Sequence, residues 1–178
     1  MTLNLLLLTL LLAVIFWLAI SAKQNTPKTS SMHPDHHASI STGLASNTPT
    51  LNFTFHPIDT DTDCIHTYDT SIMGLFVCLN PDCGWRWSSR KVTITIRMYP
   101  GMKYNARVYH QRCRICRWVA QPRLDRSYTQ RVVYRLRKWS GIRDVAVPDY
   151  EECFDGHPVG KGEHDRELCE GCKAGRCD

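Results

Sequence analysis

The sequence predicts an α+β fold in which a small antiparallel sheet carries one packed helix. Three observations lead to this prediction. The 178-residue chain contains 9 cysteines, several of them in close pairs. Residues 92–98 alternate strictly between apolar and polar side chains, whereas residues 128–139 carry apolar side chains at helical spacing. Residues 3–22 are almost wholly apolar and uncharged, which sets the amino-terminal end apart from the folded part.

The amino-terminal segment, residues 1–22, is predicted to be a transmembrane helix that acts as a signal anchor. Twenty helical residues at about 1.5 Å each span about 30 Å, which is the thickness of the hydrocarbon layer. The nearest basic residues, Lys23 and Lys28, follow the span, so the positive-inside rule places the rest of the chain in the cytosol. The expected location is therefore a membrane, crossed once. The alternative is a cleaved signal peptide, which small residues at Ala19 and Ser21 and the glycosylation sequon at Asn52 favour.

Residues 23–50 are predicted to be a flexible linker. They are rich in Ser, Thr, Asn, Pro and His and hold few large apolar side chains. The histidines of this segment, His33, His36 and His37, are interpreted as part of a solvated tether, with weak metal binding as the alternative. The folded domain is expected to span residues 51–178.

The first part of this domain is predicted to form two strands of an antiparallel hairpin. In the segment 92–98, Val, Ile, Ile and Met face one side while Thr, Thr and Arg face the other. Pro100-Gly101 supplies the turn, and residues 104–111 alternate again and pair back. A short strand is expected at residues 74–78. Cysteine-containing turns at both sides of the hairpin give it the layout of a zinc ribbon.

One helix follows, over residues 128–139. Its predicted apolar stripe consists of Tyr128, Val132, Leu136 and Trp139. Asp125 or Ser127 can cap its start, and Gly141 suits the position after its end. The stripe is expected to pack on the sheet.

The cysteines predict two metal sites. Cys-x-x-Cys pairs favour metal over disulfides, because so short a loop rarely closes without strain. Zn²⁺ takes four Cys or His ligands in a tetrahedron, and structural sites leave no open position. The candidate ligands fall into two sets along the chain, Cys78, Cys83, Cys113 and Cys116 in the first and His164, Cys169, Cys172 and Cys177 in the second.

Other groupings stay open at this point. Cys153 is a rival for the fourth place in the second set, and Cys64 is expected to be spare. His110 lies close to the second cysteine pair but is expected to pack or hydrogen-bond rather than bind metal. The irregular segment that ends the chain is predicted to be a loop ordered by the second metal ion.

These elements complete the predicted fold class: α+β, a small zinc-ribbon-like antiparallel sheet with one packed helix and a metal-ordered C-terminal loop, plus an N-terminal transmembrane helix. An enzyme is not expected, because the sequence holds no helical His-Glu-x-x-His motif, phosphate-binding glycine loop or nucleophile elbow. A secreted, disulfide-bonded protein is the alternative if residues 1–22 are a signal peptide.

Charge is strongly segregated. Residues 86–143 hold 16 Lys and Arg but one acid, a net charge of +15, whereas residues 144–178 carry −6. A block this basic indicates nucleic acid, an anionic membrane surface or an acidic partner. The alternative is that these basic residues lie on solvated faces of a strand and a helix and pair with the acidic tail of the same chain.

The motifs resemble those of the 3CxxC-type zinc-finger family, over residues 70–177. The matching segments are Cys78-x4-Cys83, Trp87-Ser88-Ser89 before a Val-x-Ile-x-Ile strand, Tyr104-Asn105-x-Arg107-Val108-Tyr109-x-Gln111-Arg112-Cys113-x-x-Cys116, and His164-x4-Cys169-Glu170-Gly171-Cys172-Lys173-x-Gly175. The resemblance implies zinc binding by the three cysteine pairs, with one histidine associated with the last pair. Two features depart from the family pattern: the first pair is spaced by four residues, and the apolar segment is amino-terminal rather than carboxyl-terminal.

The family includes the receptor-transporting proteins, which help chemosensory receptors reach the plasma membrane. The resemblance therefore implies a membrane-anchored zinc-binding protein that acts as a protein-binding or trafficking adaptor, with a membrane protein or trafficking component as its partner. The alternative is a zinc finger that binds RNA through residues 86–143, where Tyr and Trp side chains interleaved with the basic residues could stack on bases.

Overall fold

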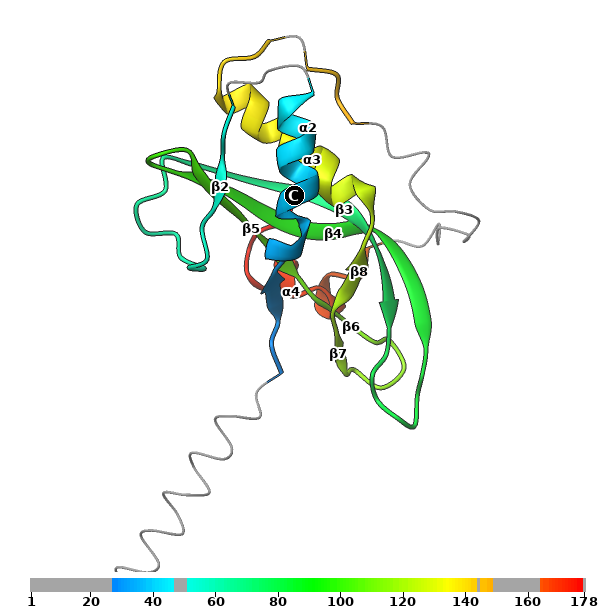
Figure 1. Ribbon diagram of the computed structural model, residues 1–178. Helices are drawn as coiled ribbons and strands as arrows, with labels where there is room; N and C mark the ends of the chain where they lie inside the picture. The colour runs from blue at the N-terminus through cyan, green and yellow to red at the C-terminus, as the bar shows by residue number, and fades with distance from the viewer. Residues whose placement is uncertain (1–26, 47–50, 144, 149–163, 178) are drawn as a thin grey trace, which may run out of the picture.

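A six-stranded sheet forms the centre of the chain. The computed structural model describes residues 27–46, 51–143, 145–148 and 164–177 (Figure 1). The strands lie in the order β1-β5-β4-β3-β8, and β2 pairs in parallel with β5 while every other pairing in this sheet is antiparallel. Their bounds are β1 Ser30–Met32, β2 Thr54–Phe55, β3 His66–Val77, β4 Arg86–Tyr99, β5 Lys103–Tyr109 and β8 Pro122–Leu124. A second, two-stranded sheet pairs β6 Gln111–Arg112 with β7 Val119–Ala120.

The predicted hairpin is confirmed as β4 and β5. Ile94 pairs with Val108 and Met98 with Tyr104, in an antiparallel register. The apolar side chains of β4 at Val92, Ile94 and Ile96 are fully buried in the main core. Period-two alternation therefore correctly assigned the face of this strand that meets the core.

The predicted helix is also confirmed, as α3 Arg126–Trp139. The side chain of Asp125 caps it by accepting a hydrogen bond from the Ser127 amide, and Gly141 follows its end at a φ of 82°. Tyr128, Val132 and Leu136 are fully buried against the sheet.

A second helix, α2 His37–Ala45, lies beside α3 on the same face of the sheet (Figure 1). Ile40 and Leu44, one helical turn apart, bury their side chains in the core. Ahead of α2, strand β1 pairs with β5, Ser30 opposite Tyr109. The prediction of a flexible linker over residues 23–50 is therefore wrong for residues 30–45, because two well-placed apolar residues and backbone pairing suffice to order a segment of polar composition.

The predicted fold class requires two corrections. The sheet is larger than a zinc ribbon, and two helices, not one, cover it. The predicted transmembrane helix and single-pass membrane location find no support: within residues 27–46, 51–143, 145–148 and 164–177, no helix is both long and apolar enough to cross a bilayer. Residues 1–22, on which that prediction fell, lie outside these described ranges.

The second face of the sheet is polar, yet it is also buried. Thr93, Thr95 and Arg97 of β4 point to this side and have at most 1% of their surface exposed. The loop between β2 and β3 and the carboxyl-terminal segment cover them. A strand that alternates between apolar and polar residues therefore has both faces inside the protein.

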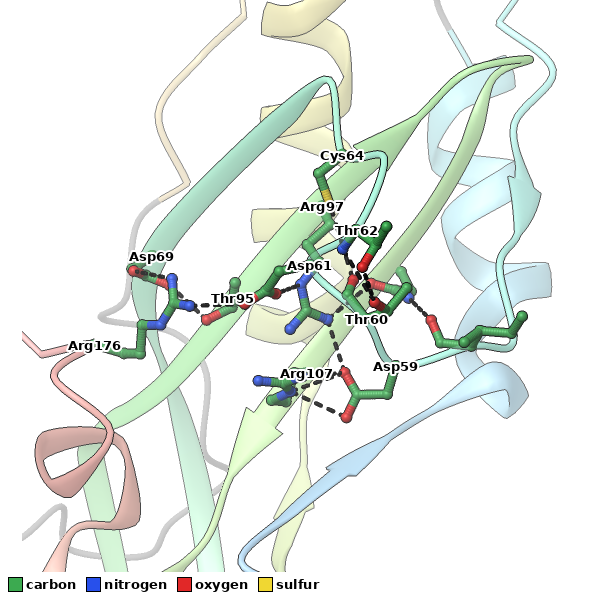
Figure 2. A network of polar contacts seen from close by, with 12 residues as sticks. Asp59, Thr60, Asp61, Thr62, Cys64, Asp69, Thr95, Arg97, Arg107 and Arg176 are labelled. Atoms are coloured by element: carbon green, nitrogen blue, oxygen red, sulfur yellow. Dashed lines mark hydrogen bonds and ion pairs between the residues drawn. The ribbon is translucent and has the colours of Figure 1, made fainter.

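An ion-pair network fills this polar face (Figure 2). The side chain of Arg97 has 0% exposure and lies 2.8 Å from Asp59 and 2.6 Å from Asp61, both in the covering loop. Arg107 pairs with Asp59 at 2.8 Å, and Arg176 reaches Asp61 at 3.0 Å. Burial opposes ionisation of Asp61, but the attraction of these three guanidinium groups lowers its pKa. The network therefore joins the loop, the sheet and the carboxyl-terminal segment.

Candidate metal centres

The first cysteine cluster lies at the end of the long β3–β4 pair. The register of this pair shifts between Ile72 and Gly74 and then continues to Val77 opposite Arg86, which carries the turn at Cys78 away from the helices. The sulfur atoms of Cys78, Cys83, Cys113 and Cys116 all lie within 4.8 Å of one another. We call this group the tip cluster.

Two turns of similar construction hold the tip cluster. The amide of Cys78 donates to the Trp85 carbonyl at 2.8 Å, and the amide of Cys113 donates to the Trp118 carbonyl at 2.9 Å. In each turn, the residue before the tryptophan has a positive φ, 56° at Gly84 and 62° at Arg117. The wider first turn is closed by hydrogen bonds from Cys83 and Gly84 to the Asn80 carbonyl. The first turn is two residues longer than the second, yet its closing hydrogen bond and its positive φ before the tryptophan are similar.

The sulfur spacing of the tip cluster suits zinc. Sulfur atoms at about 2.3 Å from a tetrahedral Zn²⁺ are separated by about 3.8 Å. The distance from Cys83 to Cys113 is 3.7 Å, and that from Cys78 to Cys116 is 3.4 Å. Burial raises the pKa of Cys78 to about 12, whereas a hydrogen bond from the Trp118 amide lowers the pKa of Cys116 to about 7. The thiol of Cys116 is therefore the more readily deprotonated of these two.

The second group, which we call the terminal cluster, is local in sequence. Its ligand atoms also lie within 4.8 Å of one another and belong to His164, Cys169, Cys172 and Cys177. The His164 Nε2 atom is 3.1 Å from the Cys172 sulfur, and the sulfurs of Cys169 and Cys177 are 3.7 Å apart. A 3-10 turn, Arg166–Leu168, and the short helix α4, Glu170–Lys173, shape the chain between these residues.

The terminal cluster is attached to the sheet. Cys169 forms an antiparallel bridge with Gln111, and the Glu170 amide donates to the His110 carbonyl at 3.1 Å. The Thr93 hydroxyl lies 2.7 Å from the Cys177 sulfur. Gly171 fits here because a Cβ atom would lie 2.6 Å from the Thr93 side chain.

A salt bridge connects the two cysteine clusters. Arg112, next to Cys113, places its Nε atom 2.5 Å from the Glu170 carboxylate, which is largely buried and also meets Lys173 at 3.1 Å. Arg112 also donates to the Arg117 carbonyl in the turn of the tip cluster. This arginine of the basic block therefore has a structural role between the metal centres.

The protonation of the terminal cluster suits metal binding. Burial raises the pKa of Cys169 and of Cys177, so both thiols carry their protons at neutral pH without metal. Burial lowers the pKa of His164, which keeps its imidazole neutral as ligation requires. Metal binding must therefore release protons from the thiols.

The remaining candidates fall outside both clusters. Cys64 lies in the loop that covers the polar face, with its thiol 3.8 Å from the Thr60 carbonyl. His110 makes hydrogen bonds to the Lys28 carbonyl and to Ser31, in line with the packing role expected for it. Cys153, the rival ligand, lies outside the described residues. The alternative grouping that uses Cys153 stays a prediction.

The structure gathers one further group of potential ligands, for which the sequence indicated weak metal binding only as the alternative and without Asp35. His33, Asp35 and His36 bring two imidazole nitrogens and a carboxylate oxygen within 4.8 Å of one another. The spacing His-x-Asp-His could have identified this group, whereas His37, the third histidine considered, forms a hydrogen bond with the Tyr104 hydroxyl instead.

Comparison with protein families gives one match, to a zinc-binding domain of the 3CxxC zinc-ribbon type, over residues 71–175. The matched region contains the tip cluster and most of the terminal cluster. The chain belongs to this family. It is therefore a zinc-binding protein, and its two cysteine-rich clusters fit two Zn²⁺ ions. Comparisons with curated proteins and with solved structures give no match, and the match does not confirm the receptor-transporting subtype.

Proposed function

We propose that this zinc-binding protein is a protein-binding module that uses the end of its zinc ribbon as the docking surface. The supporting observation is an exposed apolar cluster around the tip cluster, which we call the tip surface. It consists of Leu79, Trp85, Ile115 and Trp118, with 70%, 40%, 62% and 53% of their surface exposed. Each of these side chains lies within two residues of a cysteine of the tip cluster. Zinc thus fixes the backbone that presents them.

The composition of the tip surface favours a partner segment that combines apolar and acidic side chains. Tryptophan and arginine are enriched among the residues that dominate binding energy at protein interfaces. The guanidinium of Arg114 lies 5.3 Å from the centre of the Trp85 ring, and Arg86, Arg90 and Arg117 are also exposed close by in the chain. Burying one such large apolar side chain contributes about 1.5–3 kcal/mol.

The alternative, RNA binding through residues 86–143, has less support because internal contacts occupy many of the basic side chains. Arg97 and Arg107 pair with Asp59, and Arg112 pairs with Glu170. The guanidinium of Arg135 lies 3.1 Å from the centre of the Tyr68 ring. Arg137 donates to the Gly43 carbonyl and Lys138 to the Arg143 carbonyl. Six of the sixteen basic side chains in this block therefore have partners inside the fold, three of them carboxylates.

We further propose a binding role rather than an enzymatic one. Each cysteine cluster offers four protein ligands to one ion, and closed four-ligand zinc sites are structural. A membrane-protein or trafficking partner, implied by the resemblance to receptor-transporting proteins, remains a prediction.

The test is a peptide selection on the zinc-loaded chain, using phage that display random peptides. We expect the selected peptides to combine apolar with acidic residues. Their affinity should fall at least tenfold for the double variant Ile115→Ser/Trp118→Ser, because two large contact side chains are lost. The matched control is Ile58→Ser/Val147→Ser, which removes two exposed apolar side chains elsewhere and should bind as the unmodified chain does.

Zinc content and thermal stability of both double variants should equal those of the unmodified chain. Peptides that bind the tip variant and the unmodified chain equally would overturn the proposal. Single-stranded poly(U) is the second probe: binding that is tight at low salt and falls steeply with added salt would favour the RNA alternative instead.

A further inference from the structure

The turn before α2 collects three potential metal ligands far from both cysteine clusters in sequence. The 3-10 turn Pro34–His36 places the Asp35 carboxylate between two imidazoles. One carboxylate oxygen is 3.9 Å from Nδ1 of His33, and the other is 3.7 Å from Nε2 of His36. Ligand atoms at about 2.1 Å from a shared ion are about 3.4 Å apart in a tetrahedron. One ligand atom from each of the three residues lies within 4.8 Å of the others, so side-chain rotation would bring all three to one ion.

A chain of hydrogen bonds fixes which nitrogen of His33 carries its proton. Nδ1 of His110 lies 2.7 Å from the Lys28 carbonyl, which can only accept, so this nitrogen carries the proton of His110. Nε2 of His110 must then accept from the Ser31 hydroxyl, at 3.1 Å. The Ser31 oxygen in turn accepts from Nε2 of His33, at 3.0 Å. The lone pair of His33 is therefore left on Nδ1, the nitrogen that faces Asp35.

This arrangement is the one that metal-binding histidines use. Such a histidine donates its second ring N–H to an oxygen acceptor, which fixes both its tautomer and its orientation. His110 donates from one nitrogen and accepts at the other, and His33 donates from Nε2 while Nδ1 keeps its lone pair, which is the pattern of neutral rings. His33 is nearly fully buried, with 9% exposure, and so is held ready in one orientation.

Tyr128 gives an independent indication of a missing group. Its ring packs against the rings of His36 and His33, with centroids 5.1 Å and 5.9 Å away. Tyr128 has 0% exposure, and its hydroxyl has no hydrogen-bond partner within the described part of the chain. A buried hydroxyl without a partner is costly, which indicates that a further group binds in this part of the structure.

We propose that His33, Asp35 and His36 form a third divalent-metal site, next to the ring of Tyr128. Two imidazole nitrogens and one carboxylate suit borderline cations such as Zn²⁺, Co²⁺ or Ni²⁺. Without thiolate ligands, this site binds metal more weakly than the cysteine clusters do. The side chain of Asp35 is 72% exposed, which gives the ion a route from solvent.

The test uses the full chain with both cysteine clusters filled with zinc, followed by titration with Co²⁺. We expect one additional ion by native mass spectrometry, with weak visible bands of Co²⁺ and no thiolate charge-transfer band in the near ultraviolet. Asp35→Asn should weaken Co²⁺ binding at least tenfold, and because Asp35 is exposed this change leaves the fold intact. His36→Ala should abolish binding.

Two further variants separate ligation from packing. His37→Ala is the matched control, because His37 bonds to the Tyr104 hydroxyl instead and should leave Co²⁺ binding unchanged. Ser31→Ala removes the orienting acceptor of His33 and should weaken binding by about 10–100-fold. The proposal is overturned if the zinc-filled chain binds no third ion at millimolar Co²⁺, or if Asp35→Asn and His36→Ala bind it as tightly as the unmodified chain.

Discussion

The tip cluster and the terminal cluster offer zinc similar ligand sets in different surroundings. The tip cluster lies beyond the register shift of β3 and β4, and exposed apolar side chains surround it. The terminal cluster lies against the sheet, where Thr93 contacts Cys177 and Cys169 bridges to Gln111. One cluster therefore shapes a projecting surface, whereas the other attaches a segment to the body of the domain.

The two metal ions therefore stabilise different parts of the structure. At the tip, zinc orders two turns that have too few apolar side chains to form a core of their own. At the carboxyl-terminal end, zinc orders a cover for the polar face of the sheet. Arg176, which precedes Cys177, brings its charge to Asp61 and Asp69 in the ion-pair network. Loss of the terminal ion should consequently destabilise more of the fold than loss of the ion at the tip.

The largest effect is expected from Cys172→Ser, which removes one half-buried ligand of the terminal cluster. Losing this ion releases the segment that covers Thr93 and that brings Arg176 to Asp61 and Asp69. We expect a loss of stability above about 4 kcal/mol, or about 10 °C in Tm, measured by calorimetry. Native mass spectrometry should show one zinc ion fewer. A Tm within 2 °C of the unmodified chain would mean that the terminal cluster does not support the sheet.

The next largest effect is expected from Asp59→Asn, which tests the network beneath the terminal segment. Arg97 has 0% side-chain exposure and would lose one of its two carboxylate partners, and Arg107 would lose its own. Removing one partner of a buried ion pair costs about 3 kcal/mol. Chemical denaturation should detect this loss at unchanged zinc content. Asp82→Asn, an exposed change in the first turn of the tip, is the control and should have no effect on stability.

Cys116→Ser is the counterpart of Cys172→Ser at the tip, since both cysteines are half-buried. We expect the loss of one zinc ion but a smaller loss of stability, about 2 kcal/mol, because only β6, β7 and the ends of β3 and β4 depend on the tip cluster. Peptide binding at the tip surface should disappear. Equal Tm losses in the two serine variants would remove the distinction between the clusters.

The smallest effect is expected from Thr93→Val. This change removes the hydroxyl beside the Cys177 sulfur while keeping the shape of the side chain. Zinc affinity of the terminal cluster should fall about tenfold, as for other groups that orient metal ligands. A chelator competition should show this fall for one of the two ions. Thr67→Val, an exposed threonine of β3, serves as the control. If both ions are released as from the unmodified chain, Thr93 does not orient the cluster.

Much of this arrangement could be predicted from the sequence, because ligand spacing and side-chain period are local signals. The structure gathers the eight predicted ligands into the same two groups of four, and the strand at residues 92–98 and the helix near Tyr128 form as expected. The interpretation of β4 was incomplete, however. Thr93, Thr95 and Arg97 have the pattern of a solvent-facing side. The groups that cover Thr93 and Arg97 are distant in the sequence: Cys177 contacts Thr93, and Asp59 and Asp61 pair with Arg97.

The amino-terminal part was less predictable. Ile40 and Leu44 lie among small polar residues, so the composition of this segment did not predict α2. Strand β1 is ordered by backbone pairing to β5, which no pattern of side chains predicts. His33 and His36 were interpreted as part of a solvated tether for the same reason, with weak metal binding as the alternative. Long-range contacts, absent from local patterns, decide the structure of such segments.

Hydrogen exchange of strand β4 in the two serine variants tests the contrast between the clusters most directly. The amides of residues 93–97 pair with β3 and β5, below the cover that the terminal cluster orders. We predict that Cys172→Ser accelerates their exchange strongly, whereas Cys116→Ser leaves it unchanged and accelerates only residues near the tip. Equal acceleration at residues 93–97 in both variants, or in neither, would contradict the account.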